Sequence, residues 1–401
     1  MSDQDETAQA VLSRPLDLPC GARLKNRLIK SAMSDSLGDG TGNPTEPQMR
    51  LYERWAEGGT ALSLIGEVQI SPDCPEKPGN LVLVPDANLD AMRALARRGS
   101  ADGARIWPQL GHAGALAHAP ISQPKGPSPL EVGGLSCAGM TAEDLRALPG
   151  LYARTAKLAQ SAGFGGVQIH AGHGFLLSQF LSPLFNHRTD AYGGSIDRRM
   201  RIVCEIVEAV RLAVGPAFPI GIKINATDKL VGGLTEDEAL EGVRRLDSTS
   251  IDLIDVSGGT YFPGAASSSD GAASDGPYFQ AFARRAKAIT SVPIMLTGGV
   301  RTREDARAAL AGGAADAVGL ARAMVLDPGL ANRWLSVQGG DPAFPVFEAP
   351  PQGGITAWYT MRLTALGEEA EAQFATSPQA ALDAYDRRDA ERSARWLKHF
   401  G

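Results

Sequence analysis

The feature that most constrains the fold is a regular alternation between short apolar runs and longer segments of helical periodicity. A chain that repeats strand and helix in this way builds a parallel sheet covered by helices. The strand-like runs lie at about Arg27–Met33, Ala61–Gly66, Ala104–Leu110, Gly166–His170, Ile220–Asn225, Leu253–Ser257, Pro293–Thr297 and Ala317–Leu320. Eight such units predict an α/β fold, a (β/α)8 TIM barrel. The doubly wound alternative is disfavoured because no G-x-G-x-x-G follows the first run.

The segments between these runs carry signals for the start of a helix. Thr141, Thr235 and Thr302 are each followed three residues later by an acidic residue, a pattern close to a capping box. The predicted helices are Thr45–Glu57, Thr141–Gln160, Ile196–Val214, Thr235–Leu246, Phe279–Thr290 and Thr302–Ala311.

The chain divides into a lead-in at residues 1–23, a barrel at 24–335 and a helical tail at 336–401. The barrel region is longer than the about 250 residues typical of this class. Its excess lies in loops at 111–140 and 258–276, which we expect above the C-terminal rim, where specificity loops are found. The tail could pack on its own barrel or on a second copy, so a homo-oligomer stays open.

Composition excludes several classes of protein. The net charge is −6 with mixed signs, so no basic surface for nucleic acid is expected. The four cysteines are scattered without a C-x-x-C pair, which disfavours a metal site. No apolar run approaches the ~20 residues that cross a bilayer, and the acidic N-terminus does not resemble a signal peptide. We therefore expect a cytoplasmic protein with a small-molecule substrate.

The strand ends carry a chemically selective set of side chains. In a barrel of this class the active site is assembled at these ends. Gly298 and Gly299 would let the backbone approach a ligand, and Arg322 offers a fork for an anion, which indicates a phosphate site after the last two strands. Gln109 and Lys223 could match the polar edge of a flavin, where a cation stabilises the reduced ring.

One long segment points to a family. Residues 163–201, GFGGVQIHAGHGFLLSQFLSPLFNHRTDAYGGSIDRRMR, resemble the signature stretch of the Old Yellow Enzyme family. The flanking segments NRLIKSAMS (26–34), WAEGGTALSLIGEVQISP (55–72), IWPQLGHAG (106–114) and TGGV…GLAR (297–322) extend the resemblance to about residues 12–335.

The resemblance implies an FMN enzyme with NAD(P)H as co-substrate, passing hydride to an electron-poor alkene, nitro compound or quinone. The implied cofactor contacts are Ala32, Met33, Ser34, Gly66, Gln109 and Lys223 around the ring, and Gly298, Gly299, Ala321 and Arg322 at the phosphate. His170 and His173 match the pair that donates hydrogen bonds to a substrate oxygen. Two imidazoles converging on one oxygen would stabilise the negative charge that develops during hydride transfer.

Three positions depart from the family pattern. Phe175 stands where the family usually has a Tyr that protonates the substrate's α-carbon, and its ring has no donor. Tyr261 or water could replace it. Ser34 stands for the usual Thr or Cys. Lys223 stands for the usual Arg, which keeps the charge but loses the bidentate fork. The cysteine group and second nucleotide-binding domain of larger relatives are not found, so nicotinamide is expected to reduce FMN directly.

Three alternatives stay open. Oxidative removal of an N-methyl group needs no proton donor at Phe175. A non-redox phosphate-binding barrel, such as an aldolase, would be colourless. A non-catalytic barrel would bind flavin without turnover.

Overall fold

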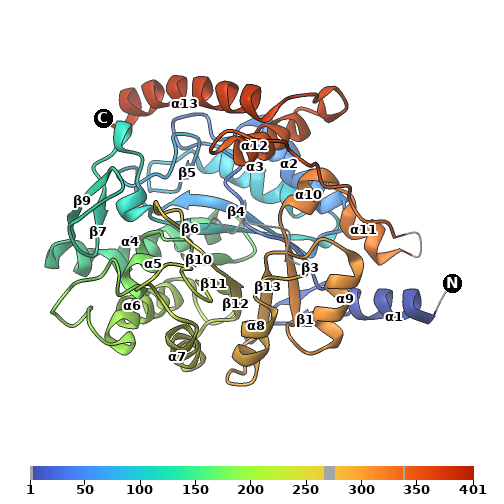
Figure 1. Ribbon diagram of the computed structural model, residues 1–401, viewed down its shortest axis with the longest axis horizontal. Helices are drawn as coiled ribbons and strands as arrows, with labels where there is room; N and C mark the ends of the chain where they lie inside the picture. The colour runs from blue at the N-terminus through green and yellow to red at the C-terminus, as the bar shows by residue number, and fades with distance from the viewer. Residues whose placement is uncertain (1–2, 266–275, 337–338) are drawn as a thin grey trace.

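The computed structural model describes residues 3–265, 276–336 and 339–401 (Figure 1). Within these ranges a closed barrel is built from the parallel strands β3 (Leu28–Lys30), β4 (Leu62–Gln69), β6 (Arg105–Gly111), β10 (Val167–Ala171), β11 (Ile220–Asn225), β12 (Leu253–Ser257), β13 (Ile294–Thr297) and β14 (Ala317–Leu320). Closure follows from β3, which pairs with β14 on one side and β4 on the other. The predicted (β/α)8 TIM barrel is confirmed.

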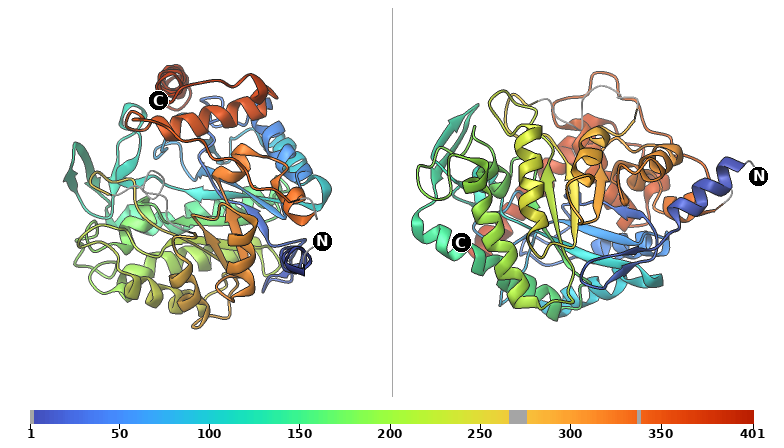
Figure 2. Two further views of the ribbon diagram at one scale, coloured as in Figure 1. Left: turned by 45° about the vertical axis from the view of Figure 1, so that its right-hand side comes forward. Right: turned by 90° about the horizontal axis from the view of Figure 1, so that it is seen from below.

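Helices surround the barrel on its outer face (Figure 2). They include α2 (Glu46–Glu57), α3 (Leu89–Gly99), α4 (Ala142–Ser161), α6 (Ile196–Val214), α7 (Glu236–Asp247), α8 (Gln280–Lys287) and α9 (Arg303–Ala311). Complete capping boxes begin α4 at Thr141, α7 at Thr235 and α9 at Thr302, as predicted. The prediction missed α3, which is capped by Asn88, and it extended α8 past its end.

The N-terminal segment is more structured than a lead-in. It forms α1 (Asp3–Leu12) and a hairpin of β1 (Leu16–Asp17) and β2 (Arg23–Leu24). Leu16 and Leu24 join Trp107 and other buried barrel residues in one apolar cluster. The hairpin therefore packs against the barrel core.

The loop at 111–140 contains two turns of 3-10 helix and a small sheet. These are η2 (Gly114–Leu116), η3 (Ala119–Ile121), β7 (Lys125–Gly126), β8 (Leu130–Val132) and β9 (Leu135–Gly139). A short strand, β5 (Leu81–Val82), pairs with the end of β4. Two short helices, α5 (Leu176–Leu181) and α10 (Arg322–Leu326), follow β10 and β14, and α11 (Leu330–Leu335) follows α10.

The C-terminal tail packs on its own barrel. It consists of α12 (Gly354–Gly367), η4 (Glu371–Gln373) and α13 (Pro378–Phe400), and α12 contacts α2. Arg54 donates to the carbonyl of Leu366 at 2.8 Å, and Trp396, 1% exposed, is buried with Val82 and Ile121. Figure 1 shows α12 and α13 along the top of the molecule and α1 lower down at its right-hand edge. In the described ranges, no helix combines the length and apolarity needed to span a membrane.

Candidate active site

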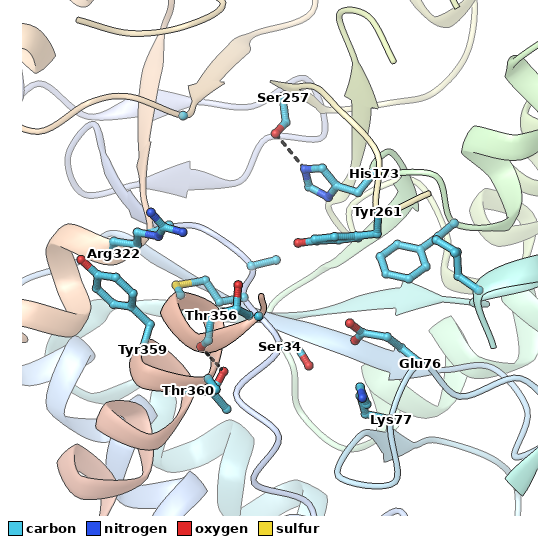
Figure 3. Close-up of a pocket in the computed structure, with 18 of the residues that line it drawn as sticks. Ser34, Glu76, Lys77, His173, Ser257, Tyr261, Arg322, Thr356, Tyr359 and Thr360 are labelled. Atoms are coloured by element: carbon cyan, nitrogen blue, oxygen red, sulfur yellow. Dashed lines mark hydrogen bonds between the residues drawn. The ribbon is translucent and has the colours of Figure 1, made fainter. Parts of the chain in front are cut away.

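A cavity of about 820 Å³ opens at the carboxyl ends of the barrel strands (Figure 3). Most of the predicted site residues line it, namely Ala32, Met33, Ser34, His173, Phe175, Lys223, Tyr261, Gly298, Gly299, Ala321 and Arg322. Gly66, Gln109 and His170 lie outside the lining. The loop at 111–140 also contributes to the wall, through residues such as Ala115 and Leu135.

One end of the cavity is shaped by backbone. Gly298 and Gly299 have φ of 108° and 80°, the region that favours glycine. A Cβ on Gly299 would lie 2.7 Å from the carbonyl oxygen of Gly276 and 2.9 Å from the amide nitrogen of Tyr278. Arg322 begins α10, and its guanidinium lies 4.9 Å from the ring centre of Tyr359. A tight glycine turn beside a guanidinium suits the phosphate of FMN.

A buried polar network forms the floor. Lys223 Nζ lies 3.2 Å from Asp255 Oδ2, and both side chains are almost fully buried. Asp255 also accepts from Gln168 and Thr297, at 3.1 and 2.6 Å. Gln109 donates to Gln168 at 2.6 Å, which holds its amide in this network behind the cavity wall. Lys223 reaches the cavity while its charge is balanced by Asp255.

Ser34 and Gly66 differ in what they offer a ligand. Ser34 Oγ is buried and lines the cavity beside the Glu76 carboxyl, whose pKa is raised by burial and lowered in part by the Ser34 hydrogen bond. A hydroxyl at this place could also donate to a polar atom of a bound cofactor ring. A Cβ on Gly66 would lie 2.2 Å from the carbonyl oxygen of Met33, so glycine is required there for the close contact between β4 and the segment that follows β3.

The two histidines stand in series. His173 lines the cavity, and its Nε2 lies 2.9 Å from Ser257 Oγ. Its Nδ1 lies 3.1 Å from His170 Nε2, and His170 Nδ1 lies 2.9 Å from Glu67 Oε1, although that contact is not aligned as a ring N–H hydrogen bond. His170 is 2% exposed. The expected convergence of both imidazoles on one oxygen is therefore not seen in this structure.

Burial sets the charge of this chain of groups. It lowers the pKa of His170 to about 3 and the pKa of His173 well below its usual value, with Lys223 adding to both effects. Burial raises the pKa of Glu67 to about 8, although Lys223 opposes this. At neutral pH both rings are neutral and the Glu67 carboxyl holds a proton.

Aromatic rings cover the histidine end. Phe175, 3% exposed, lies 4.9 Å from His170 and 5.7 Å from Tyr261 between ring centres. Tyr261 is 58% exposed and lies 5.9 Å from His173. Figure 3 shows Tyr261 and His173 on one side of the cavity and Arg322 with Tyr359 on the other.

Sequence reasoning missed several groups at this site. Gln168 and Asp255 are polar residues inside otherwise apolar strands, and this interruption was the available signal. Glu67 could be placed at a strand end next to Gly66, but its role could not be inferred from that position. The tail contributes Thr356, Tyr359, Thr360 and Tyr385 to the wall, and no local pattern marks them. Among the described residues, no three His, Cys, Asp or Glu side chains are grouped to hold a metal ion.

Comparison with known proteins agrees with this geometry. The model of the "NADH:flavin oxidoreductase / NADH oxidase family" matches residues 12–337. The chain is 33% identical over 395 residues to the NADH-dependent flavin oxidoreductase iliE of Hypocrea jecorina, covering 87% of this chain and 97% of that protein. It is 35% identical over 350 residues to the protein of the same name from Neonectria sp., covering 79% of this chain and 46% of that protein. The chain thus spans about half the length of the second relative.

A solved structure extends the comparison to the fold. The old yellow enzyme homologue of Zymomonas mobilis superposes with a TM-score of 0.72 at 22% identity, covering 87% of this chain and 98% of that one. These findings confirm the predicted resemblance, with FMN as cofactor and NAD(P)H as co-substrate. The chain belongs to the NADH:flavin oxidoreductase / NADH oxidase family, which includes the Old Yellow Enzyme relatives.

Proposed function

We propose that this protein transfers hydride from NAD(P)H to an electron-poor alkene, nitro compound or quinone. One observation carries the proposal: a single cavity joins a glycine and arginine end, suited to phosphate, to a histidine end suited to a polarised acceptor. Donor and acceptor would use this cavity in turn.

The residues present fit FMN. Gly298, Gly299, Ala321 and Arg322 would hold its phosphate, while Ala32, Met33, Ser34 and Lys223 would surround its ring. Bound there, FMN would carry hydride between the nicotinamide and the acceptor. Gln109 and Gly66 would act indirectly, by positioning Gln168 and the strand end at Met33.

The protein's own groups then act on the acceptor. His173 and Ser257 present polar hydrogens at the cavity wall, where they would bind an acceptor oxygen and stabilise its developing charge. Phe175 closes the apolar side and excludes water. It cannot supply the proton that an alkene needs at its α-carbon.

The test is an absorption spectrum of the purified protein, reconstituted with FMN where needed, followed by anaerobic titration. NADH or NADPH should bleach the flavin band, and 2-cyclohexen-1-one, a nitroaromatic or a benzoquinone should restore it. A protein that retains no FMN, or whose bleached flavin none of these acceptors restores, contradicts the proposal.

A second candidate is oxidative N-demethylation of a small methylated amine. The ring of Tyr261 lies within 6 Å of the rings of His173 and Phe175, and an aromatic wall of this kind attracts an alkylammonium group. Anaerobic bleaching by methylated amines, with none by either nicotinamide, would favour this candidate.

A further inference from the structure

A short row of buried polar groups leads from the strand β4 to the cavity. Glu67 and His170 approach to 2.9 Å, His170 and His173 to 3.1 Å, and His173 and Ser257 to 2.9 Å. Glu67 sits at an irregularity in β4, where the register to β6 shifts between Ile65 and Val68, and it has a φ of 59°. A non-glycine residue in this conformation carries backbone strain. The surrounding structure therefore holds Glu67 in place through a specific local distortion of the strand.

We propose that Glu67, His170 and His173 form a proton relay, which supplies the α-carbon of an alkene substrate with the proton that Phe175 cannot donate. The proposal rests on the alkene-reducing function above. Glu67 and His170 are positioning residues, because they act through His173, whereas His173 lies at the cavity.

The relay has a direction because every member starts neutral. In the tautomers that the relay uses, the protonated Glu67 carboxyl turns to donate to Nδ1 of His170, which lies 2.9 Å from Oε1. His170 then donates Nε2–H to Nδ1 of His173, and His173 directs Nε2–H toward Ser257 and the cavity. Neutral imidazoles in this arrangement pass a proton by exchanging tautomers, without either ring becoming cationic. The strongly lowered pKa values of both rings agree with this requirement.

FMN held in the cavity would supply the hydride that bonds to the β-carbon, and the π-electron pair of the alkene forms the new C–H bond at the α-carbon. That proton leaves the His173–Ser257 end of the relay, each ring passes one proton on, and Glu67 becomes a carboxylate. After product leaves, one proton from solvent adds to Nε2 of His173 in concert with the reverse shift, which restores Glu67.

Four titratable groups lie around the Glu67 carboxyl, either in contact with it or close enough to interact with its charge. His170 approaches it from β10, and Lys223 from β11 stabilises its charged form. Glu76, in the segment between β4 and β5, interacts with its charge unfavourably, whereas the phenol of Tyr152 on α4 stays neutral because burial and the Glu67 charge raise its pKa. Lys223 therefore favours the carboxylate that the relay leaves behind, while Glu76 favours its reprotonation.

The first test measures histidine tautomers by ¹⁵N NMR in the oxidised holoenzyme. The signals of His170 are identified as those that disappear in the His170→Asn variant. We expect the Nε2–H tautomer of His170 at pH 6 and a change toward Nδ1–H as pH rises through about 8, where Glu67 ionises. Glu67→Gln should abolish the change. Glu76→Gln, which removes a cavity-lining carboxyl whose pKa is also raised to about 8, should retain it. An Nδ1–H tautomer at pH 6, or a transition that survives in Glu67→Gln, overturns the relay.

The second test separates protonation from electron transfer. Reduced holoenzyme is mixed with 2-cyclohexen-1-one or with ferricyanide, which takes electrons without protonation of carbon. Glu67→Gln should slow reoxidation by the enone ~10–100-fold and leave that by ferricyanide within ~2-fold. Equal slowing with both acceptors, or no slowing with the enone, contradicts the relay.

The two proposals fail differently. A wild-type enzyme that NADH bleaches but that reduces no enone refutes the alkene substrate and, with it, the relay's role. A normal enone rate together with an unchanged rate in Glu67→Gln refutes the relay alone.

Discussion

The two ends of the cavity are built in different ways. The phosphate end depends on backbone conformation over a few consecutive residues, with φ of 108° and 80° at Gly298 and Gly299. The histidine end depends on side chains from four strands, β4, β10, β11 and β12, which meet behind His173. Local geometry leaves a mark in local sequence, whereas a side-chain network leaves only isolated polar residues in apolar strands. Variants at each end can break or sharpen this contrast.

The largest effect is expected at the backbone end. Gly299→Ala places a Cβ 2.7 Å from a carbonyl oxygen and forces alanine into a left-handed conformation, so FMN should bind ~100-fold more weakly, equivalent to about 2.7 kcal/mol. Flavin fluorescence quenching during titration of the apoprotein measures this. Gly313→Ala is the matched control, because Gly313 has a φ of 67° and nothing within 4 Å of its added Cβ. An equal loss in both variants would mean that strain alone, rather than the shape of the cradle, explains the result.

The next effect tests the histidine end. Phe175→Tyr adds a phenol beside the His170 and Tyr261 rings and should speed enone reduction ~10-fold if protonation limits turnover. The same change in a Glu67→Gln background should restore a rate that no longer depends on the relay. Single-turnover reoxidation by 2-cyclohexen-1-one gives both numbers. Unchanged rates, with flavin reduction shown to be fast, would discard protonation as the limiting step.

At the phosphate end, replacing a side chain should lower FMN affinity less than distorting the backbone does. Arg322→Lys keeps the charge and loses the bidentate fork, so FMN affinity should fall only ~5-fold. The same fluorescence titration applies, with salt held constant. A loss larger than that of Gly299→Ala would reverse the contrast between the two ends.

A change in the pH dependence of stability tests the Glu67 carboxyl itself. The folded protein keeps a proton on Glu67 up to about pH 8, whereas the unfolded chain releases it near its ordinary value of 4.5. Folding therefore takes up a proton in this window, and stability falls as pH rises through it. Glu67→Gln removes this contribution. The Tm of Glu67→Gln should match that of the wild type near pH 4.5. As pH approaches 8 it should exceed the wild-type Tm by ~2–4 °C for each kcal/mol of stability that the wild type loses. Above pH 8 the difference between the two Tm values should stay constant.

The barrel could be predicted from sequence because its signals are local. β11, β12 and β14 begin and end where the apolar runs do, and Thr141, Thr235 and Thr302 cap the predicted helices. The missed helix α3 has only a weak start signal at Asn88. The small sheet β7–β9 lies in a segment rich in Gly and Pro, where strands this short show no alternation.

The site was only partly predictable for a related reason. Glycines and Arg322 could be placed from strand ends alone, and they line the cavity. The serial arrangement of the histidines could not, because it depends on the rotamer of His170 and on the carboxyl of Glu67, more than 100 positions earlier. The tail residues Tyr359 and Tyr385 reach the cavity through packing of α12 and α13 on the barrel. The spacing of residues in the sequence does not predict this contact.

The irregularity in β4 has an evolutionary consequence. Neighbouring strand residues point to opposite faces, so one inserted or removed residue between Ile65 and Val68 would exchange the inner and outer faces of everything beyond it. A relative shorter by one position there would present a different side chain behind His170, even if every other residue of the strand were identical. A sequence alignment that allows a gap at this point would align the strand correctly and still assign the wrong side chain to the position behind His170.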